Sequence, residues 1–160
     1  MEPQRRSRRI AMTDEERDGF LGTERVCRVA SVGADGQPHA TPLWFVWLPS
    51  TPALWLYSIV RSQRWVDLSR DSRVGVVVDA GSAYQELRGV EIGGRVEIVG
   101  EVPRLGRSVP ELEEPERAFA RKYGGNDSLA YDGRHGWLRL QPQKVTSWDF
   151  RKVAAVRPPP

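Results

Sequence analysis

Six short segments of strand-forming residues, separated by turn signals, restrict the possible fold more than any other feature of this sequence. The segments are rich in Val, Ile, Trp, Tyr and Phe, which favour strands, while Gly, Pro, Asp and Ser mark the turns. Such spacing with few helices predicts a mainly β protein, a closed or partly closed antiparallel barrel of six strands. The predicted strands are 26–32, 37–47, 53–58, 74–78, 87–99 and a last strand or strand pair at 137–140 and 144–150.

Individual strands carry further signals. The 74–78 segment is apolar throughout, which predicts burial on both of its faces. Adjacent glycines at Gly93 and Gly94 predict a bulge or a sharp bend in the 87–99 strand. The Gly33–Gly36 segment, with its Asp-Gly pair, predicts a hairpin turn.

Two helices have recognisable ends. Thr13 followed by Glu16 is a capping box, so a helix is expected from there to about Leu21, ended by Gly22. A second helix is expected over 115–123, with a proline at its first position. Its neighbouring carboxylates are predicted to form a solvated face: Glu111, Glu113, Glu114 and Glu116.

The segment 54–68 joins a strand to another helix through a basic turn. Ser62 is placed to cap this helix, which continues to about Arg70. The free amides of the first helical turn, together with the guanidiniums of Arg61 and Arg64, form an expected anion site. Taken alone, these local residues favour the simpler interpretation, a strand, a solvated basic turn and a helix.

Length and charge define the broad class of protein. The chain has 160 residues and a net charge of +3, which fits one globular domain at 13–152. A loose, disordered basic arm is expected at 1–12 and a flexible tail at 153–160. The longest apolar run, 43–48, is too short to cross a bilayer, and no nucleic-acid-binding signature accompanies the charge. We therefore expect a cytoplasmic protein without a membrane or nucleic-acid partner.

Residues for catalysis by the protein itself are scarce. The single Cys27 lies in a predicted strand and is expected to be a buried thiol. His39 and His135 are the two histidines, and no metal-ligand spacing or nucleophile motif accompanies them. His39 is either a surface histidine or a cofactor contact, and the six tryptophans are core residues or ligand walls. A bound cofactor would then carry the chemistry, with no catalytic residue and no metal required of the chain.

Four segments resemble the pyridoxamine-5'-phosphate-oxidase-like split-barrel family, and within it the actinobacterial flavin/deazaflavin oxidoreductases. They span most of the predicted domain in the family's order. At three positions the sequence departs from the family pattern: Arg64 replaces Lys, Asp67 replaces Asn and Ser72 replaces Pro. The segments are Ala34-Asp35-Gly36-Gln37-Pro38-His39 with Thr41-Pro42-Leu43-Trp44, Arg61-Ser62-Gln63-Arg64-Trp65-Val66-Asp67-Leu68-Ser69-Arg70-Asp71-Ser72-Arg73-Val74, Tyr84 with Leu87-Arg88-Gly89-Val90, and Ser147-Trp148-Asp149-Phe150-Arg151-Lys152.

The resemblance implies a six-stranded antiparallel split barrel of the FMN-binding type, assembled as a homodimer with a cofactor in each cleft between protomers. It implies that the 62–64 segment holds the cofactor phosphate and that the 39–44 strand flanks the ring and ribityl chain. It also implies that Trp148 closes the site, either from the same chain or from the partner chain. The implied cofactor-binding residues are His39, Thr41, Pro42, Trp44, Tyr57, Ser58, Arg61, Ser62, Gln63, Arg64, Arg88 and Trp148.

The family divides between cofactors. A basic, arginine-rich chain suits the anionic tail of a deazaflavin (coenzyme F-420), with FMN as the alternative and haem as a minor one. The implied function is hydride transfer between the deazaflavin and an unidentified small organic substrate. An FMN-dependent oxidase or flavin reductase, and a non-enzymatic flavin- or haem-binding protein, remain open. Arg64 is expected near the surface, so that its loss weakens cofactor binding without affecting folding.

Overall fold

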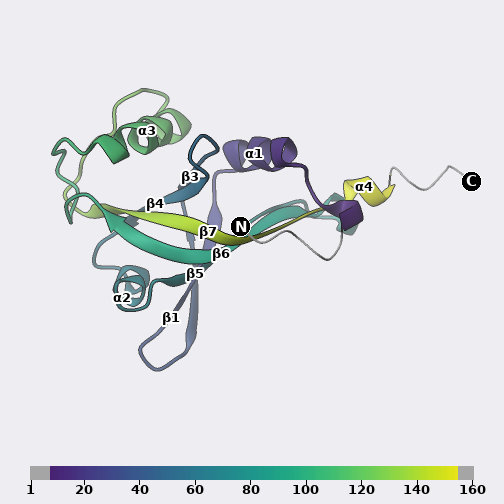
Figure 1. The fold of residues 1–160 in the computed structure, drawn as a ribbon, viewed down its shortest axis with the longest axis horizontal. Coiled ribbons are helices and arrows are strands. Elements are labelled where there is room, and N and C mark those ends of the chain that lie inside the picture. Colours follow the sequence, from purple (N-terminus) through teal and green to yellow (C-terminus); the bar gives the residue numbers. More distant parts are fainter. Residues whose placement is uncertain (1–7, 155–160) are drawn as a thin grey trace, which may run out of the picture.

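Seven antiparallel strands form one strongly curved sheet, with the helices placed around it (Figure 1). The computed structural model describes residues 8–154. The sheet order is β2-β1-β5-β6-β7-β4-β3. The predicted mainly β split barrel is confirmed, with seven strands instead of six. The strands are β1 (Cys27–Val32), β2 (Pro38–Leu43), β3 (Phe45–Leu48), β4 (Ala53–Ile59), β5 (Arg73–Ala80), β6 (Arg88–Val99) and β7 (His135–Asp149).

The extra strand arises where the predicted 37–47 strand divides at Trp44. Before that residue β2 pairs with β1, and after it β3 pairs with β4. Strands β2 and β3 are therefore the two edges of the sheet, joined by a single residue. This connection requires the sheet to curl until its edges approach each other. Of the two alternatives predicted for the end of the chain, the single strand is the one observed, since β7 is one strand that pairs with both β4 and β6.

The interior of the curled sheet holds the larger apolar core. Side chains from β1, β3, β4, β5, β6 and β7 meet there. Helix α1 (Asp14–Thr23) contributes Phe20 and Leu21, and helix α2 (Gln63–Arg70) contributes Trp65 and Leu68. The β5 prediction needs correction, because valines 74, 76 and 78 are buried while Gly75 and Val77 are only half-buried. One face of β5 therefore lies outside the core.

A second core lies on the outer face of β3, β4 and β7, under helix α3 (Pro110–Phe119) and the π-helical turn η3 (Ala120–Gly124). Figure 1 shows α3 and α2 on opposite sides of the strands β4 and β7. The helix begins at Pro110, not at Pro115, so the predicted start is wrong. Pro110 occupies a first-turn position, where the missing N–H has no helical partner to lose. Pro115 lies inside the helix and is buried against the sheet together with Leu112 and Phe119.

One carboxylate of the predicted solvated face is buried. Glu116 is 9% exposed and forms an ion pair with Arg104, whose Nε donates to Glu116 Oε1 at 2.5 Å. Trp137 Nε1 and the Tyr131 hydroxyl also donate to this carboxylate, at 3.1 and 2.8 Å. The position was misjudged because its cationic partner is 12 residues away in the sequence. The other three glutamates of the group are exposed, as predicted.

The local predictions at turns hold. The capping box of α1 is present: Glu16 N donates to Thr13 Oγ1 at 3.2 Å, and Thr13 N donates to Glu16 Oε2 at 2.7 Å. The helix ends at Thr23, one residue beyond Gly22. In β6 the register shifts between Gly93 and Gly94, and a Cβ on Gly94 would collide with the carbonyl oxygen of Gln141. That bulge was predicted.

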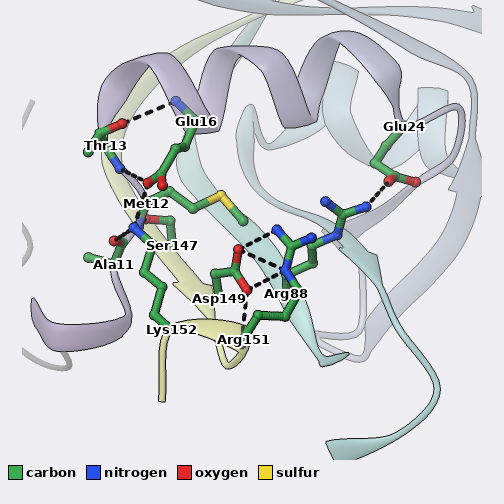
Figure 2. Close-up of polar contacts among 10 residues, drawn as sticks. All are labelled: Ala11, Met12, Thr13, Glu16, Glu24, Arg88, Ser147, Asp149, Arg151 and Lys152. Carbon is green, nitrogen blue, oxygen red and sulfur yellow. Dashed lines mark hydrogen bonds and ion pairs between the residues drawn. The ribbon is translucent and has the colours of Figure 1, made fainter. Parts of the chain in front are cut away.

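A disordered basic arm was predicted at 1–12, and the structure describes residues 8–12 of it. These five residues are part of the fold. A 3₁₀ turn, η1 (Arg8–Ile10), leads into α1. Met12 N donates to Ser147 Oγ at 3.0 Å, and Lys152 Nζ donates to Ala11 O at 2.7 Å (Figure 2). Lys152 belongs to α4 (Arg151–Ala154), so the folded chain extends slightly past 152. The remaining parts of the predicted arm and tail, 1–7 and 155–160, lie outside the described residues. Within the described range, each helix is too short or too polar to span a bilayer.

Candidate functional site

Helix α2 begins as the sequence predicts. Ser62 is its N-cap, and its Oγ accepts from Trp65 N at 3.3 Å while donating to Ile59 O at 2.7 Å. Trp65 packs into the barrel core and anchors the first turn. The amides at the start of α2 are thereby held next to the end of β4. This geometry favours anions, because the helix dipole is positive at that end.

Arg64 does not lie near the surface, so that expectation is wrong. Its side chain is 7% exposed and extends back into the end of the barrel. Its Nε and Nη2 donate to Ser58 Oγ of β4 at 3.3 and 3.2 Å, and its Nη1 donates to Thr41 Oγ1 of β2. Burial lowers the pKa of the Arg64 guanidinium. These partners are neutral hydroxyls, and no carboxylate of residues 8–154 forms an ion pair with Arg64.

A buried cation without a carboxylate partner is costly unless an anion compensates it. Arg64 therefore marks this end of the barrel as an anion site. Gln63 and His39 lie beside Asp67, a fully buried residue of α2. Gln63 Nε2 donates to Asp67 Oδ1 at 2.8 Å, and His39 Nδ1 lies 3.7 Å from Asp67 Oδ2, beyond hydrogen-bond distance. We call this group the α2 cradle: His39, Thr41, Ser58, Ser62, Gln63 and Arg64.

Arg61, another predicted phosphate contact, is exposed on the turn that precedes α2. Its position adds positive charge near the cradle without the burial that distinguishes Arg64. Water and salt screen such an exposed charge strongly. Of the two arginines, Arg64 is therefore the stronger candidate for binding an anion.

Three further predicted site residues line a separate cavity of about 530 Å³ on the outer face of β4. Tyr57 faces this cavity, whereas its neighbour Ser58 contacts Arg64 on the inner side. We call the cavity the α3 pocket. Its lining residues are Pro42, Leu43, Trp44, Tyr57, Phe119, Ala120, Tyr123, Gly124, Asn126, Ser128, Leu129, Ala130, Asp132 and His135.

Most of the α3 pocket was not predicted. Phe119 and Tyr123 were assigned only to a helix, and the loop that carries Asp132 received no role. Trp44 stacks on Tyr123, with ring centroids 4.4 Å apart and planes inclined by 6°. The density of aromatic residues was the available signal, but their convergence depends on how α3 packs against β4.

Arg88 and Trp148 are not brought to either group within one protomer. Arg88 Nη2 lies 3.6 Å from Glu24 Oε1 (Figure 2). The Arg88 guanidinium also covers the Phe20 ring, at 5.0 Å from its centroid. Trp148 is paired with Gly89 in the β6–β7 ladder and packs against it. Within the described residues, neither of the two contacts the α2 cradle or lines the cavity beside Tyr57.

The sequence also offers Cys27 and metal-binding side-chain types as candidates for chemistry. Cys27 is fully buried, and burial raises the pKa of its thiol to about 12. The thiol is therefore neutral at physiological pH, as expected of a core residue. Among the described residues, no group of three or more His, Cys, Asp or Glu side chains is arranged to hold a metal ion.

A strongly curved sheet with a buried cation at the start of α2 defines a split-barrel protein. The chain belongs to the pyridoxamine 5'-phosphate oxidase family, whose model matches residues 13–149. No curated protein matches significantly.

Solved structures share this fold. A conserved hypothetical protein of Mycobacterium tuberculosis is 27% identical, with a TM-score of 0.78, and the match covers 98% of this chain and 97% of that one. An FAD-binding protein of Mycobacterium smegmatis is 16% identical, with a TM-score of 0.62 and coverage of 86% and 94%. The haem storage protein HutZ of Vibrio cholerae is 15% identical, with a TM-score of 0.63 and coverage of 82% and 92%. At these last two identities the likeness concerns the fold alone.

Proposed function

We propose that the protein binds a flavin-type cofactor and that Arg64 and the start of α2 hold its phosphate. The observation that carries this proposal is the burial of Arg64 among neutral partners. A phosphate would supply the anion that the guanidinium lacks, while Ser62 and the α2 amides provide further donors. Membership of the pyridoxamine 5'-phosphate oxidase family and the FAD-binding neighbour support the same class of cofactor.

Within this class we propose a deazaflavin (coenzyme F-420) and a place in the actinobacterial flavin/deazaflavin branch. The support is the excess of basic residues, since the deazaflavin tail carries more negative charge than FMN. When bound, a reduced deazaflavin supplies a hydride to an organic acceptor. The chain itself would bind the phosphate through the α2 cradle, orient the ring and exclude water with aromatic side chains. FMN is the second candidate.

Titration of the purified protein with coenzyme F-420, FMN and haem tests this proposal. We expect coenzyme F-420 to bind more tightly than FMN, and both more tightly than haem. Absorbance and fluorescence changes of each cofactor report the binding directly. If FMN binds more tightly than coenzyme F-420, the proposed cofactor is FMN and not a deazaflavin. Binding of haem alone would contradict an oxidoreductase function.

We also propose a two-fold symmetric homodimer that holds a cofactor at the interface. Apolar side chains remain uncovered in the protomer: Trp44 is 49% exposed, Val66 52% and Ile98 45%. Exposed apolar patches are typical of interfaces, and two-fold dimers are the commonest assemblies. Light scattering at micromolar concentration is expected to give twice the mass of one chain. A monomer at that concentration would contradict the dimer and the shared cofactor site.

A further inference from the structure

The α3 pocket has the volume of a small-molecule site and walls rich in aromatic rings. Its volume of about 530 Å³ lies within the range of small-molecule sites in proteins. The Tyr57 ring packs edge-to-face against Phe119, with centroids 5.4 Å apart, and stacks on His135, with centroids 4.8 Å apart and planes inclined by 25°. Trp44 and Tyr123 stack across another part of the wall. Packed rings of this kind present flat apolar surfaces that favour aromatic ligands.

One polar group in the pocket lacks a partner. Tyr57 is 7% exposed, and its buried hydroxyl has no hydrogen-bond partner among the described residues. Burial, followed by the charges of Asp132 and Glu116, raises the pKa of Tyr57 to about 12. The hydroxyl therefore keeps its proton at neutral pH and can donate. Leaving a buried donor unsatisfied costs about 1–3 kcal/mol, which a ligand acceptor would offset.

The hydroxyl of Tyr123, in the same pocket, has hydrogen-bond partners, unlike that of Tyr57. Its hydroxyl accepts from Phe45 N at 3.0 Å and lies 2.8 Å from the carbonyl oxygens of both Phe45 and Arg25. This tyrosine has a structural role and its donor is already engaged. The unsatisfied donor at Tyr57 is thus specific to one point of the wall.

The charge of the pocket differs from that of the α2 cradle. Among the described lining residues, Asp132 is the one with an ordinarily charged side chain. Although burial alone would raise the pKa of Asp132, hydrogen bonds from Arg134 N and from the His135 ring lower it overall. His135 Nδ1 lies 2.7 Å from Asp132 Oδ2, so the carboxylate also holds this ring against Tyr57. An ionised carboxylate disfavours anionic ligands.

We propose that the α3 pocket binds the substrate, a neutral flat aromatic molecule whose carbonyl oxygen accepts a hydrogen bond from Tyr57. That this molecule is the hydride acceptor rests on the proposed function, whereas its binding to the pocket does not. The pocket and the α2 cradle thus favour ligands of different charge, and they lie on the two faces of β4. An uncharged aromatic ligand would enter on one side and an anionic cofactor tail on the other.

Three naphthalene probes of nearly equal shape test this proposal in the cofactor-free protein by equilibrium dialysis. 2-Acetylnaphthalene carries the carbonyl acceptor, 2-isopropenylnaphthalene replaces its oxygen by a methylene group, and 2-naphthoate is an anion. We expect the ketone to bind about tenfold more tightly than the alkene, the gain of one buried hydrogen bond. The naphthoate is expected to bind more weakly than the ketone, because burying its charge near Asp132 is unfavourable.

Tyr57→Phe removes only the hydroxyl and is expected to abolish the preference for the ketone over the alkene. It is expected to keep the fold, since no protein hydrogen bond of the described residues is lost. Tyr84→Phe, at a tyrosine that is 71% exposed, is the matched control and is expected to keep the preference. Equal binding of ketone and alkene, a preference that survives Tyr57→Phe, or tighter binding of naphthoate would each overturn the proposal. Cofactor titration is a separate measurement, so its failure would reject the proposed function and leave the pocket assignment standing.

Discussion

Glu116→Ala is expected to lower the free energy of unfolding by about 3 kcal/mol, the low end of the usual effect of removing one partner from a buried ion pair, because Arg104 keeps Glu101 as a second partner. Arg104 is 2% exposed and would lose the carboxylate that its Nε and Nη2 contact at 2.5 and 3.2 Å. Hydrogen bonding to Glu116 raises the pKa of Arg104 in the intact protein. The guanidinium stays charged after this hydrogen bond is lost, because arginine is protonated at physiological pH in its unperturbed state as well. Trp137 and Tyr131 would each lose an acceptor as well.

Urea unfolding followed by tryptophan fluorescence measures this effect. The matched control is Glu113→Ala, one turn earlier in α3 and exposed, for which a change below about 0.5 kcal/mol is expected. Glu116→Ala is also expected to loosen the α3 pocket. His135 lines that pocket, and its carbonyl oxygen accepts from Arg104 N at 2.7 Å. A change in Glu116→Ala no larger than that of the control would show that the ion pair does not hold α3 on the sheet.

Arg64→Met is expected to weaken binding of coenzyme F-420, or of FMN, by about 1.5–3 kcal/mol, the loss of a charge-assisted contact to phosphate. Folding stability is expected to change little. Removing a buried cation without a carboxylate partner is favourable, and this gain offsets the hydrogen bonds lost by Ser58 and Thr41. Methionine fills most of the space of the arginine stem, so no large cavity forms.

The comparison with Arg61→Met makes this test specific. Arg61 is exposed, and its loss is expected to reduce affinity less than about threefold because solvent screens its charge. Both variants need cofactor titrations and a thermal unfolding curve. Unchanged affinity in Arg64→Met would exclude Arg64 from the cofactor site. Equal losses in the two variants would indicate a diffuse basic surface in place of a buried cradle.

Features that depend on neighbouring residues were predictable from the sequence. The capping box of Thr13 and Glu16, the N-cap at Ser62 and the hairpin turn at Gly33–Gly36 all formed. The adjacent glycines at 93 and 94 marked the bulge in a similar way, because glycine within a strand pattern is typical of a bulge. In each case the interaction that decides the conformation lies within a few residues or in the backbone itself. The family motifs added the curled sheet and the phosphate-binding role of the 62–64 segment as expectations.

Features that depend on distant partners were not predictable in this way. Nothing near Trp44 indicates that the chain leaves one sheet edge and joins the opposite one. Arg64 appeared to be a surface residue because its hydroxyl partner on Thr41 is 23 residues away. Glu116 likewise meets Trp137 over 21 residues. Hydrophobic patterning indicates which face of an element is buried, but polar side chains follow whichever partner the packed fold brings near.

The candidate site divides along the same boundary. The capping preference of serine was sufficient to place Ser62 at the start of α2. The anion preference of that start also follows locally, because it is a general property of helix N-termini. The separation of Tyr57 from Ser58 follows from strand alternation, yet alternation does not say what covers each face. Helix α3 covers one face and leaves the α3 pocket beside Tyr57, while Arg64 reaches Ser58 on the other. These contacts join segments that are remote in the chain, and curling of the sheet brings them within reach.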